Sequence, residues 1–181
     1  TLFLYTTLFR FVGILSAALK KGLLTEQGYA QMLRHTTQLN RVGIALGGLS
    51  GVHAMTDVTG FGLAGHLLEI CRGSRLDAHV DLASLPLIDE ALAFAREGIV
   101  TGASARNWSA YGADVAWPAS APAWMQALAS DPQTSGGLLV SCAPTAVDAV
   151  LATFAQAGFA QAAVVGQLSA PAGAKPQLAF A

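Results

Sequence analysis

Charged side chains are scarce in this sequence. They make up 12% of its 181 residues, whereas apolar residues make up 53%, and the formal net charge is -1. No basic cluster is larger than the pair Lys20 and Lys21. A surface that attracts nucleic acid or anionic lipid is therefore not expected, and we predict neither partner. The apolar excess predicts instead that another domain or a second subunit covers part of the surface.

Metal-binding and redox spacings are lacking as well. The two cysteines, Cys71 and Cys142, do not form a C-x-x-C pair, so we interpret both as buried thiols of a cytoplasmic protein. The four histidines show no H-x-x-x-H spacing, which argues against a zinc site. The sequence also contains no G-x-S-x-G motif, the signature of a nucleophilic serine hydrolase.

Charge is nearly missing from residues 1–19, where Arg10 is the single charged side chain. A membrane helix needs about 20 apolar residues, so this run is barely long enough and carries a charge in its middle. It also lacks the basic start and the cleavage site of a signal peptide. We therefore predict no membrane span.

What the sequence does contain is an unusual stretch from His53 to Cys71. The apolar run that ends at Asp57 predicts a buried strand, and Gly60 and Gly62 predict a tight turn before a helix from Leu63 to Cys71. Glycines let backbone N–H groups approach an anion, and the new helix points its positive end at the same place. Asp57 at the strand tip offers a hard oxygen ligand to a divalent cation. The stretch therefore predicts a phosphate and metal site.

A second loop, Asp131 to Gly137, has related chemistry. Pro132 restricts one dihedral angle, and Thr134 and Ser135 supply hydroxyl groups before the strand-like run Leu138 to Cys142. A loop tied to a buried strand can present N–H and O–H donors to a phosphate. We predict that both loops share one site.

Two other interpretations remain open from the residues alone. Gly60 to Gly65 is a literal G-x-G-x-x-G, and Asp81 follows about twenty residues later, as in a dinucleotide fingerprint that binds NAD. That interpretation requires a parallel βαβ unit from about Val52 to Asp81 with the glycines directly at the strand end, whereas Asp57 to Thr59 intervene. The other alternative is a structural dimerisation domain, which suits the apolar composition.

Two longer strings are more specific than one glycine triplet. Met55 to His66, MTDVTGFGLAGH, and Asp131 to Gly137, DPQTSGG, resemble two signatures in the C-terminal domain of the selenophosphate synthetase family, within the aminoimidazole ribonucleotide synthetase superfamily. Gly13 to Gly22 resembles the segment that joins the two domains of that family. The resemblance implies an α/β (α+β) fold with a mixed β-sheet layered with helices.

The resemblance also implies a domain plan. Thr1 to Phe11 does not match the family, so we expect residues 1–11 to be a doubtful, non-native leader, followed by an interdomain linker helix at 12–24 and the C-terminal synthetase domain at 25–181. The N-terminal catalytic domain would be absent, with its glycine-rich loop, its catalytic cysteine or selenocysteine, its essential lysine and its further magnesium-binding aspartates. We therefore expect no catalytic residue here and no turnover by the chain alone.

Members of this family make selenophosphate from selenide, ATP and water, and release AMP and phosphate. By resemblance, Asp57 would help to hold Mg²⁺ against the ATP phosphates. The expected phosphate-binding positions are Thr59, Gly60, Gly62, Thr134, Ser135 and Gly136. The superfamily generally works as dimers, so the resemblance implies a homodimer that uses ATP and selenide together with the missing domain.

Periodicity predicts the rest of the fold. A helical pattern runs from Thr25 to about Leu49, with Asn40 and Arg41 either on a solvated face or near the ligand cleft. Further helices are expected at 88–98, 122–129 and 146–156, and strands at 76–82, 115–118, 162–168 and, at a sheet edge, 177–181. The segment from Thr101 to Trp108 predicts either a capped helix start or an anion site.

Overall fold

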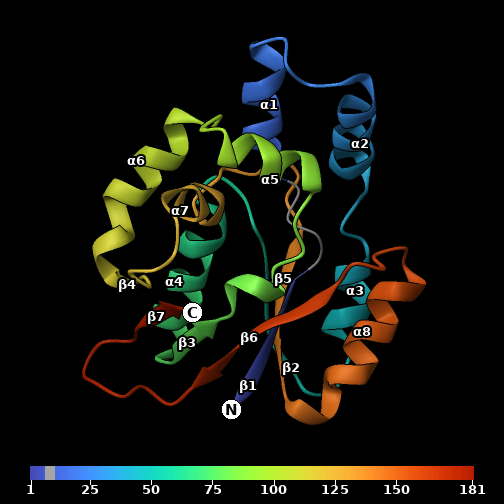
Figure 1. The fold of residues 1–181 in the computed structure, drawn as a ribbon. Helices are drawn as coiled ribbons and strands as arrows, with labels where there is room; N and C mark the ends of the chain where they lie inside the picture. The colour runs from blue at the N-terminus through green and yellow to red at the C-terminus, as the bar shows by residue number, and fades with distance from the viewer. Residues whose placement is uncertain (7–10) are drawn as a thin grey trace.

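The computed structural model describes residues 1–6 and 11–181 (Figure 1). Within these ranges the chain forms one seven-stranded sheet and eight α-helices. The strands are β1 (Leu2–Thr6), β2 (Val52–Asp57), β3 (Asp77–Val80), β4 (Val115–Ala116), β5 (Leu138–Cys142), β6 (Ala163–Ser169) and β7 (Leu178–Phe180). The helices are α1 (Val12–Lys20), α2 (Glu26–Thr37), α3 (Val42–Gly47), α4 (Gly62–Ser74), α5 (Asp89–Arg96), α6 (Gly102–Tyr111), α7 (Ala123–Ala129) and α8 (Val147–Gln156).

The sheet is mixed, as the resemblance implied. Its strand order is β2-β5-β1-β6-β3-β7-β4. All pairs from β2 to β3 are antiparallel, whereas β7 pairs in parallel with both β3 and β4. The strand predicted at 177–181 is therefore present as β7, but its predicted place at a sheet edge is wrong, because β4 pairs with its outer side.

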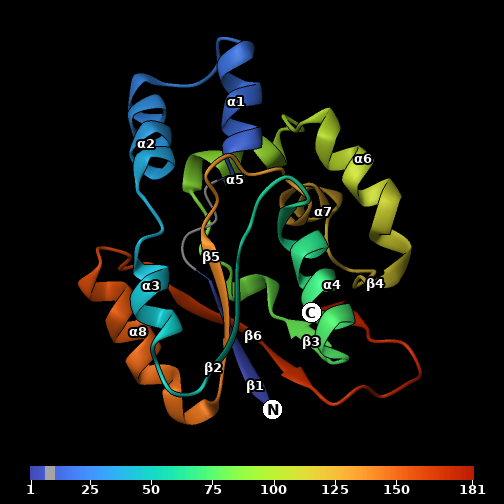
Figure 2. The same ribbon diagram turned by 180° about the vertical axis from the view of Figure 1, so that it is seen from behind.

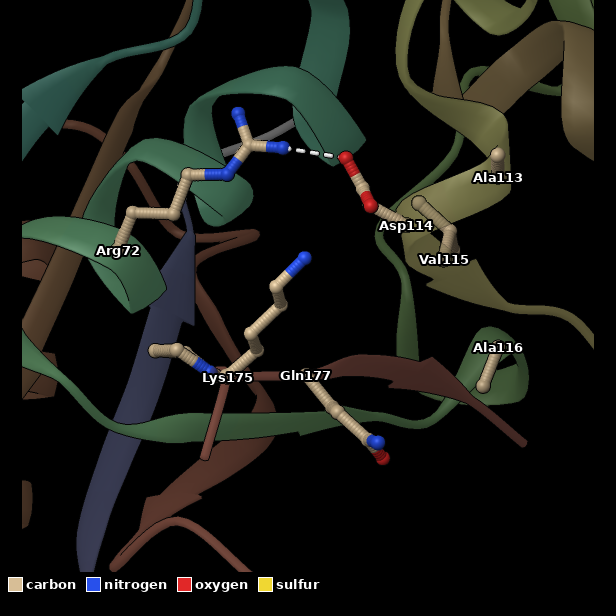
Figure 3. Close-up of a pocket in the computed structure, with 8 residues that line it drawn as sticks. Arg72, Ala113, Asp114, Val115, Ala116, Lys175 and Gln177 are labelled. Carbon is tan, nitrogen blue, oxygen red and sulfur yellow. Dashed lines mark hydrogen bonds and ion pairs between the residues drawn. The ribbon is translucent and has the colours of Figure 1, made fainter. Parts of the chain in front are cut away.

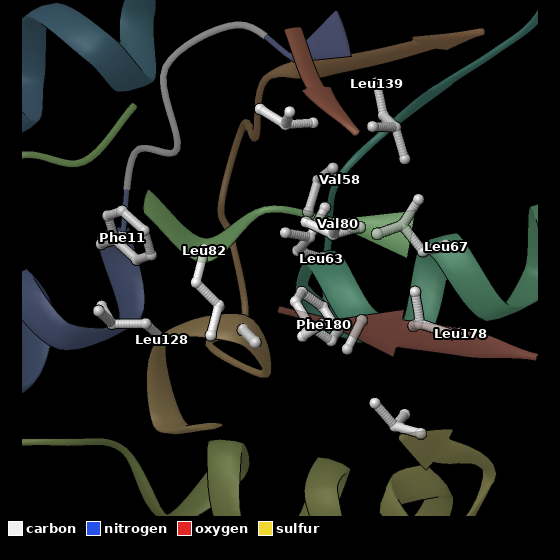
Figure 4. Packing of buried hydrophobic residues seen from close by; sticks show 14 of the residues in the cluster. Phe11, Val58, Leu63, Leu67, Val80, Leu82, Leu128, Leu139, Leu178 and Phe180 are labelled. Atoms are coloured by element: carbon white, nitrogen blue, oxygen red, sulfur yellow. The ribbon is translucent and has the colours of Figure 1, made fainter. Parts of the chain in front are cut away.

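Helices cover both faces of the sheet. Figures 1 and 2 show α3 and α8 together on one side of the molecule and α4, α6 and α7 on the other. β5 runs between the two cores, so Leu138 and Val140 join the α3/α8 cluster while Leu139 joins the larger cluster around α4. Covering both faces explains why every residue of β5 is buried and confirms the predicted buried strand there. Figure 4 shows part of the larger cluster, in which Leu63 and Leu67 of α4 lie close to Val80 and Leu178.

The strand that ends at Asp57 differs from its prediction. It forms as β2, but at the edge of the sheet, and its residues alternate between half-buried and exposed. His53, Met55 and Asp57 lie on the exposed face. The expectation of a buried strand was wrong because an edge strand with one solvated face needs apolar residues on one side only.

The single helix predicted from Thr25 to Leu49 is also wrong. α2 ends at Thr37, and Gln38 adopts an extended backbone with φ of -72° and ψ of 112° before α3 starts at Val42. Contacts from distant segments hold this break. The Gln38 side chain donates to the Gly158 carbonyl at 3.4 Å, and Asn40 Nδ2 donates to the Gly136 carbonyl at 2.8 Å.

The segment expected to be a leader contributes a strand to the sheet. β1 lies between β5 and β6, and the Leu4 side chain is fully buried. Residues 7–10, which include Arg10, lie outside the described residues, and the foreign origin of residues 1–11 stays a prediction. No helix in the described ranges has the length and apolar character needed to cross a membrane.

Candidate functional site

The two loops predicted to share a site interlock in the structure. The Val58 N–H donates to the Gly137 carbonyl at 2.9 Å, and the Gln133 N–H donates to the Thr59 carbonyl at 3.0 Å. The first of these bonds continues the antiparallel pairing of β2 with β5 by one residue, because Asp57 pairs with Leu138. The two loops therefore lie side by side, and the binding site that they are expected to share stays a prediction.

Two glycines allow this close approach. Gly62 has a φ of +68°, and a Cβ there would lie 2.6 Å from the Ser130 carbonyl carbon. A Cβ on Gly136 would overlap the carbonyl oxygen of Val58. Larger residues at either position would push the loops apart, so both glycines shape the site through the backbone.

Helix α6 contacts the turn formed by Gly60 to Gly62, called the first glycine turn below, from the protein interior. Asn107 Nδ2 donates to the carbonyls of Gly60 and Ser130, at 2.8 and 3.0 Å. The Tyr111 hydroxyl donates to the Phe61 carbonyl at 2.6 Å, and burial raises the pKa of Tyr111, which keeps the phenol protonated. These hydrogen bonds direct the carbonyl oxygens of the turn toward the protein interior. An anion that approaches the turn from the solvent therefore does not meet them.

His66 holds the turn from within α4. Its Nε2 accepts a hydrogen bond from the Thr59 N–H at 3.0 Å, and its Nδ1 lies 3.0 Å from Glu69 Oε2. A backbone N–H can only donate, so Nε2 acts as the acceptor and carries no proton. Thr59 can therefore offer a ligand its hydroxyl, which also lies 3.1 Å from the same Nε2, but not its N–H.

Asp57 stands at the tip of β2 with its side chain exposed. Within residues 1–6 and 11–181, no three His, Cys, Asp or Glu side chains come together as a metal site. Mg²⁺ commonly binds through one or two carboxylates and completes its shell with water and substrate phosphates. Asp57 fits the role of one such ligand.

The remaining predicted positions differ in accessibility. Thr134 and Ser135 are exposed, and Ser135 adopts a left-handed φ of 53°. Gly136 is buried, and its carbonyl is bound by Asn40. Gly60 and Thr134, one from each loop, line a common cavity of about 600 Å³ beside α1.

Asp131, the first residue of the second loop, is completely buried. Its Oδ2 accepts hydrogen bonds from the Ile14 N–H at 3.3 Å and from Gln133 Nε2 at 3.2 Å, and its Oδ1 lies 3.4 Å from Ser104 Oγ. Burial raises the pKa of the Asp131 carboxyl to about 7, and these hydrogen bonds offset part of that rise. The carboxyl thus ties α1 and α6 to the loop.

Residues 6–178 match the family described as AIR synthase related protein, C-terminal domain. The chain belongs to this family. The mixed sheet with helices on both faces is thus the fold of an AIR synthase related domain.

Relatives of this AIR synthase related domain include selenide, water dikinases. The protein of Paraburkholderia xenovorans (strain LB400) is 59% identical over 157 residues, which is 87% of this chain and 44% of that protein. The protein of Pseudomonas straminea is 56% identical over 161 residues, covering 89% of this chain and 45% of its own length. The chain therefore spans less than half the length of the curated relatives that it matches.

A solved structure shares the fold at low sequence identity. The hydrogenase maturation protein HypE superposes over 99% of this chain and 49% of its own, with a TM-score of 0.67 and 18% identity. The likeness supports the architecture of the AIR synthase related domain and carries no information on ligands.

The dinucleotide interpretation lacks its required geometry in the AIR synthase related domain. β2 and β3 are separated in the sheet by β5, β1 and β6, so they do not form a βαβ unit of adjacent parallel strands. Asp81 caps a short 3-10 helix instead, where its Oδ1 accepts from the Ala83 N–H at 2.9 Å.

A second cavity, of about 510 Å³, lies near the other end of α4. Arg72 Nη2 lies 2.6 Å from Asp114 Oδ2. Figure 3 shows this pair and the Lys175 side chain extending toward it. Neither the glycine turn nor the second loop lines this cavity. This cavity is therefore separate from the candidate site.

The sequence assigned no role to the side chains that hold the two loops from the protein interior, although three of them lie in the strings quoted above: His66, Asn107, Tyr111, Asp131 and Gln133. Only the spacing of Asn107 and Tyr111, which places both on one side of α6, was readable as a signal. Their partners are backbone atoms of distant segments, which no local pattern identifies.

Proposed function

We propose that this chain is the C-terminal half of a selenide, water dikinase, which makes selenophosphate from selenide, ATP and water and releases AMP and phosphate. The observation that carries the proposal is the pair of interlocked loops beside the exposed carboxylate of Asp57, in a chain 59% identical to a protein of that name. The activity belongs to the complete enzyme, and we propose that this half does not turn over alone.

In this proposal Asp57 contributes one ligand to Mg²⁺ at the edge of the sheet. Mg²⁺, when bound, neutralises phosphoryl oxygens and keeps the leaving group aligned. Thr59, Gly60, Gly62, Thr134, Ser135 and Gly136 form the wall that faces the ATP phosphates. Gly62 and Gly136 act through the loop shape that they permit, whereas Thr59, Thr134 and Ser135 carry the hydroxyl groups.

The missing half is proposed to cover the surface around Asp57. Leu39, Ile44 and Met55 leave 69%, 83% and 37% of their surface exposed, and all three belong to the α3 and β2 region. Exposed apolar side chains that gather in one region are typical of an interface. Binding there would bring the catalytic groups of the other half to the carboxylate. We also propose that the complete enzyme is a homodimer and that it is cytoplasmic.

Calorimetric titration tests the nucleotide part of the proposal. ATP is titrated into the chain with and without Mg²⁺, alone and after addition of the separately expressed N-terminal half of a relative. Asp57→Asn keeps the side-chain shape and removes the charge, and we expect it to abolish the Mg²⁺-dependent part of ATP binding. Asp81→Asn is the matched control, because Asp81 is also an exposed aspartate and lies outside the proposed site.

The same variants separate the alternatives. NAD binding that needs no Mg²⁺ and is lost in Asp81→Asn would reject the proposal in favour of a dinucleotide module. A stable dimer that binds neither nucleotide, with or without the added half, would favour a structural dimerisation domain.

A further inference from the structure

β2 has a strand partner on one side of its backbone only. It is the first strand in the sheet order, and among the described strands β5 alone pairs with it. The Val58 N–H donates to the Gly137 carbonyl, and hydrogen-bond directions alternate along an antiparallel strand, so the backbone groups of Thr56 also face β5. The N–H and C=O groups of Met55 and Asp57 therefore point to the free side of the strand.

The two edges of the sheet differ in their protection against pairing with another chain. β4, at the opposite edge, has only two residues, and Pro118 follows it closely. β2 has six residues and contains no lysine, arginine or proline, which edge strands commonly use to prevent such pairing. Its register shifts between Val52 and Ala54, so the regular part of β2 runs from Ala54 to Asp57. A further strand can therefore pair with this part of the edge.

The exposed side chains of β2 make its edge complementary to a second copy of the same edge. These side chains belong to His53, Met55 and Asp57, at every second position. When two β2 strands run antiparallel about a twofold axis at Met55, His53 of each copy lies opposite Asp57 of the other, because each is two residues from the axis. A parallel arrangement in register would instead place Asp57 opposite Asp57. The charges therefore favour the antiparallel pair.

Apolar side chains lie beside the centre of this edge. A Cβ on Gly43 would lie 3.4 Å from Met55 Cε, so α3 packs next to the middle of β2, as Figure 2 shows. Met55 leaves 37% of its surface exposed, and Ile44, the neighbour of Gly43 on α3, leaves 83% exposed. A second copy centred on Met55 would remove apolar surface from water at this place, which favours association.

We propose that two copies of this chain pair through the free edges of β2, antiparallel and centred on Met55, with a His53–Asp57 contact on each side of the axis. The two seven-stranded sheets then continue into one another. The pairing needs neither ATP nor Mg²⁺, so the inference does not rest on the proposed function. It uses the surface that the missing half is proposed to cover, so the self-paired form exists when that half is not bound.

Crosslinking tests the register. Met55→Cys places two cysteines at the axis, where the opposed Cα atoms of a hydrogen-bonded pair are about 5.5 Å apart, within the range of a disulfide. We expect a covalent dimer on oxidation, since Cys71 and Cys142 are buried and should not react. Ser50→Cys is the control, because Ser50 is exposed and its two copies would lie far outside disulfide range. Equal crosslinking of both variants, or none of Met55→Cys, would overturn the register.

Sedimentation velocity over a wide range of protein concentration tests the charge pairs. His53→Asp places two carboxylates opposite each other on each side of the axis and should raise the dissociation constant of the dimer by at least roughly tenfold. His53→Asp/Asp57→Lys restores opposite charges and should recover most of the affinity. Ala152→Asp adds one negative charge at an exposed position of α8 and should have little effect. A double variant as weak as His53→Asp would overturn the charge pairing.

Met55→Pro tests the backbone contacts. It removes an N–H that faces solvent in the single chain, so the fold should remain, as thermal unfolding checks, while the dimer should be lost. A chain that stays monomeric at every concentration, or a dimer that persists in Met55→Pro, would overturn the inference.

The same variant distinguishes the other occupant of this edge. A monomeric chain that binds the added N-terminal half, with weaker binding in Met55→Pro, would assign the edge to that half and reject self-pairing. A dimer that crosslinks through Met55→Cys but shows no Mg²⁺-dependent ATP binding, with or without the added half, would support the pairing and reject the proposed function.

Discussion

The carboxylate of Asp131 accepts a hydrogen bond from the backbone N–H of Ile14, 117 residues earlier in the chain. The bond is 3.3 Å long and joins the first turn of α1 to the second glycine loop. A Cβ on Gly13 would clash with the same carboxylate, so the helix and the loop are in direct contact. This relationship makes the packing of α1 sensitive to the charge of one buried side chain.

The first prediction concerns the pH dependence of stability. The pKa of Asp131 rises from 3.8 to about 7 in the folded chain, so between these values the folded chain holds a proton that the unfolded chain releases. The contribution of Asp131 to the free energy of unfolding should therefore fall as the pH rises from about 4 to about 7, by at most roughly 4 kcal/mol, and then level off. Urea denaturation at a series of pH values measures it.

Asp131→Asn is the control for that prediction. Its amide can accept from Ile14 and Gln133 and donate to Ser104 Oγ, so the packing should survive while the titration disappears. We expect a flatter pH profile and higher stability than the unmodified chain near pH 8. An unchanged slope in this variant would show that another group is responsible.

The second prediction contrasts two glycines of the candidate site. Gly136→Ala places a methyl group against the Val58 carbonyl oxygen, a backbone atom that cannot move without breaking the loop contact. We expect a loss of more than about 3 kcal/mol in the free energy of unfolding. Gly60→Ala meets nothing within 4 Å and should change it by less than about 1 kcal/mol. Similar denaturation midpoints for the two variants would contradict the interlocked geometry.

Much of the fold was predictable because its signals are local. The alternation of residues 76–82 and the apolar run 138–142 gave β3 and β5, and the glycines after Asp57 gave the turn before α4. The two resembling strings also led to loops that meet in space.

The rest depends on distant contacts. The break between α2 and α3 is held by the carbonyls of Gly136 and Gly158, far along the chain. The edge position of β2 depends on which strands pair with β5, and the burial of Asp131 depends on α1 and α6. None of these features has a periodic pattern, so composition and spacing could not give them.

The third prediction concerns the first glycine turn. His66→Phe keeps an aromatic ring in the buried position but removes the acceptor for the Thr59 N–H. The unpaired N–H should cost about 1–3 kcal/mol of stability and speed amide hydrogen exchange at Thr59. Glu69→Gln keeps an oxygen near Nδ1 at an exposed position and should change stability by less than about 1 kcal/mol. Unchanged exchange at Thr59 in His66→Phe would refute this role.

The fourth prediction concerns the apolar surface beside Asp57. Ile44→Lys alters a side chain that is 83% exposed, so the stability of the isolated chain should change by no more than about 0.5 kcal/mol. If the missing half covers this surface, a buried lysine should weaken its binding by at least about tenfold. Ala155→Lys, on the exposed side of α8, provides the control. Equal binding of the added half by both variants would place the interface elsewhere.

The central position of β1 in the sheet affects how the chain folds while it is being synthesised on the ribosome. Leu4 pairs with Ser141 of β5 and with Gly166 of β6, so during synthesis β1 must wait for partners that lie 137 and 162 residues later in the sequence. At about 5–20 residues per second, that wait lasts roughly ten to thirty seconds. During it the strand exposes apolar side chains and unpaired backbone groups, which are the features that chaperones bind and that other nascent chains can pair with.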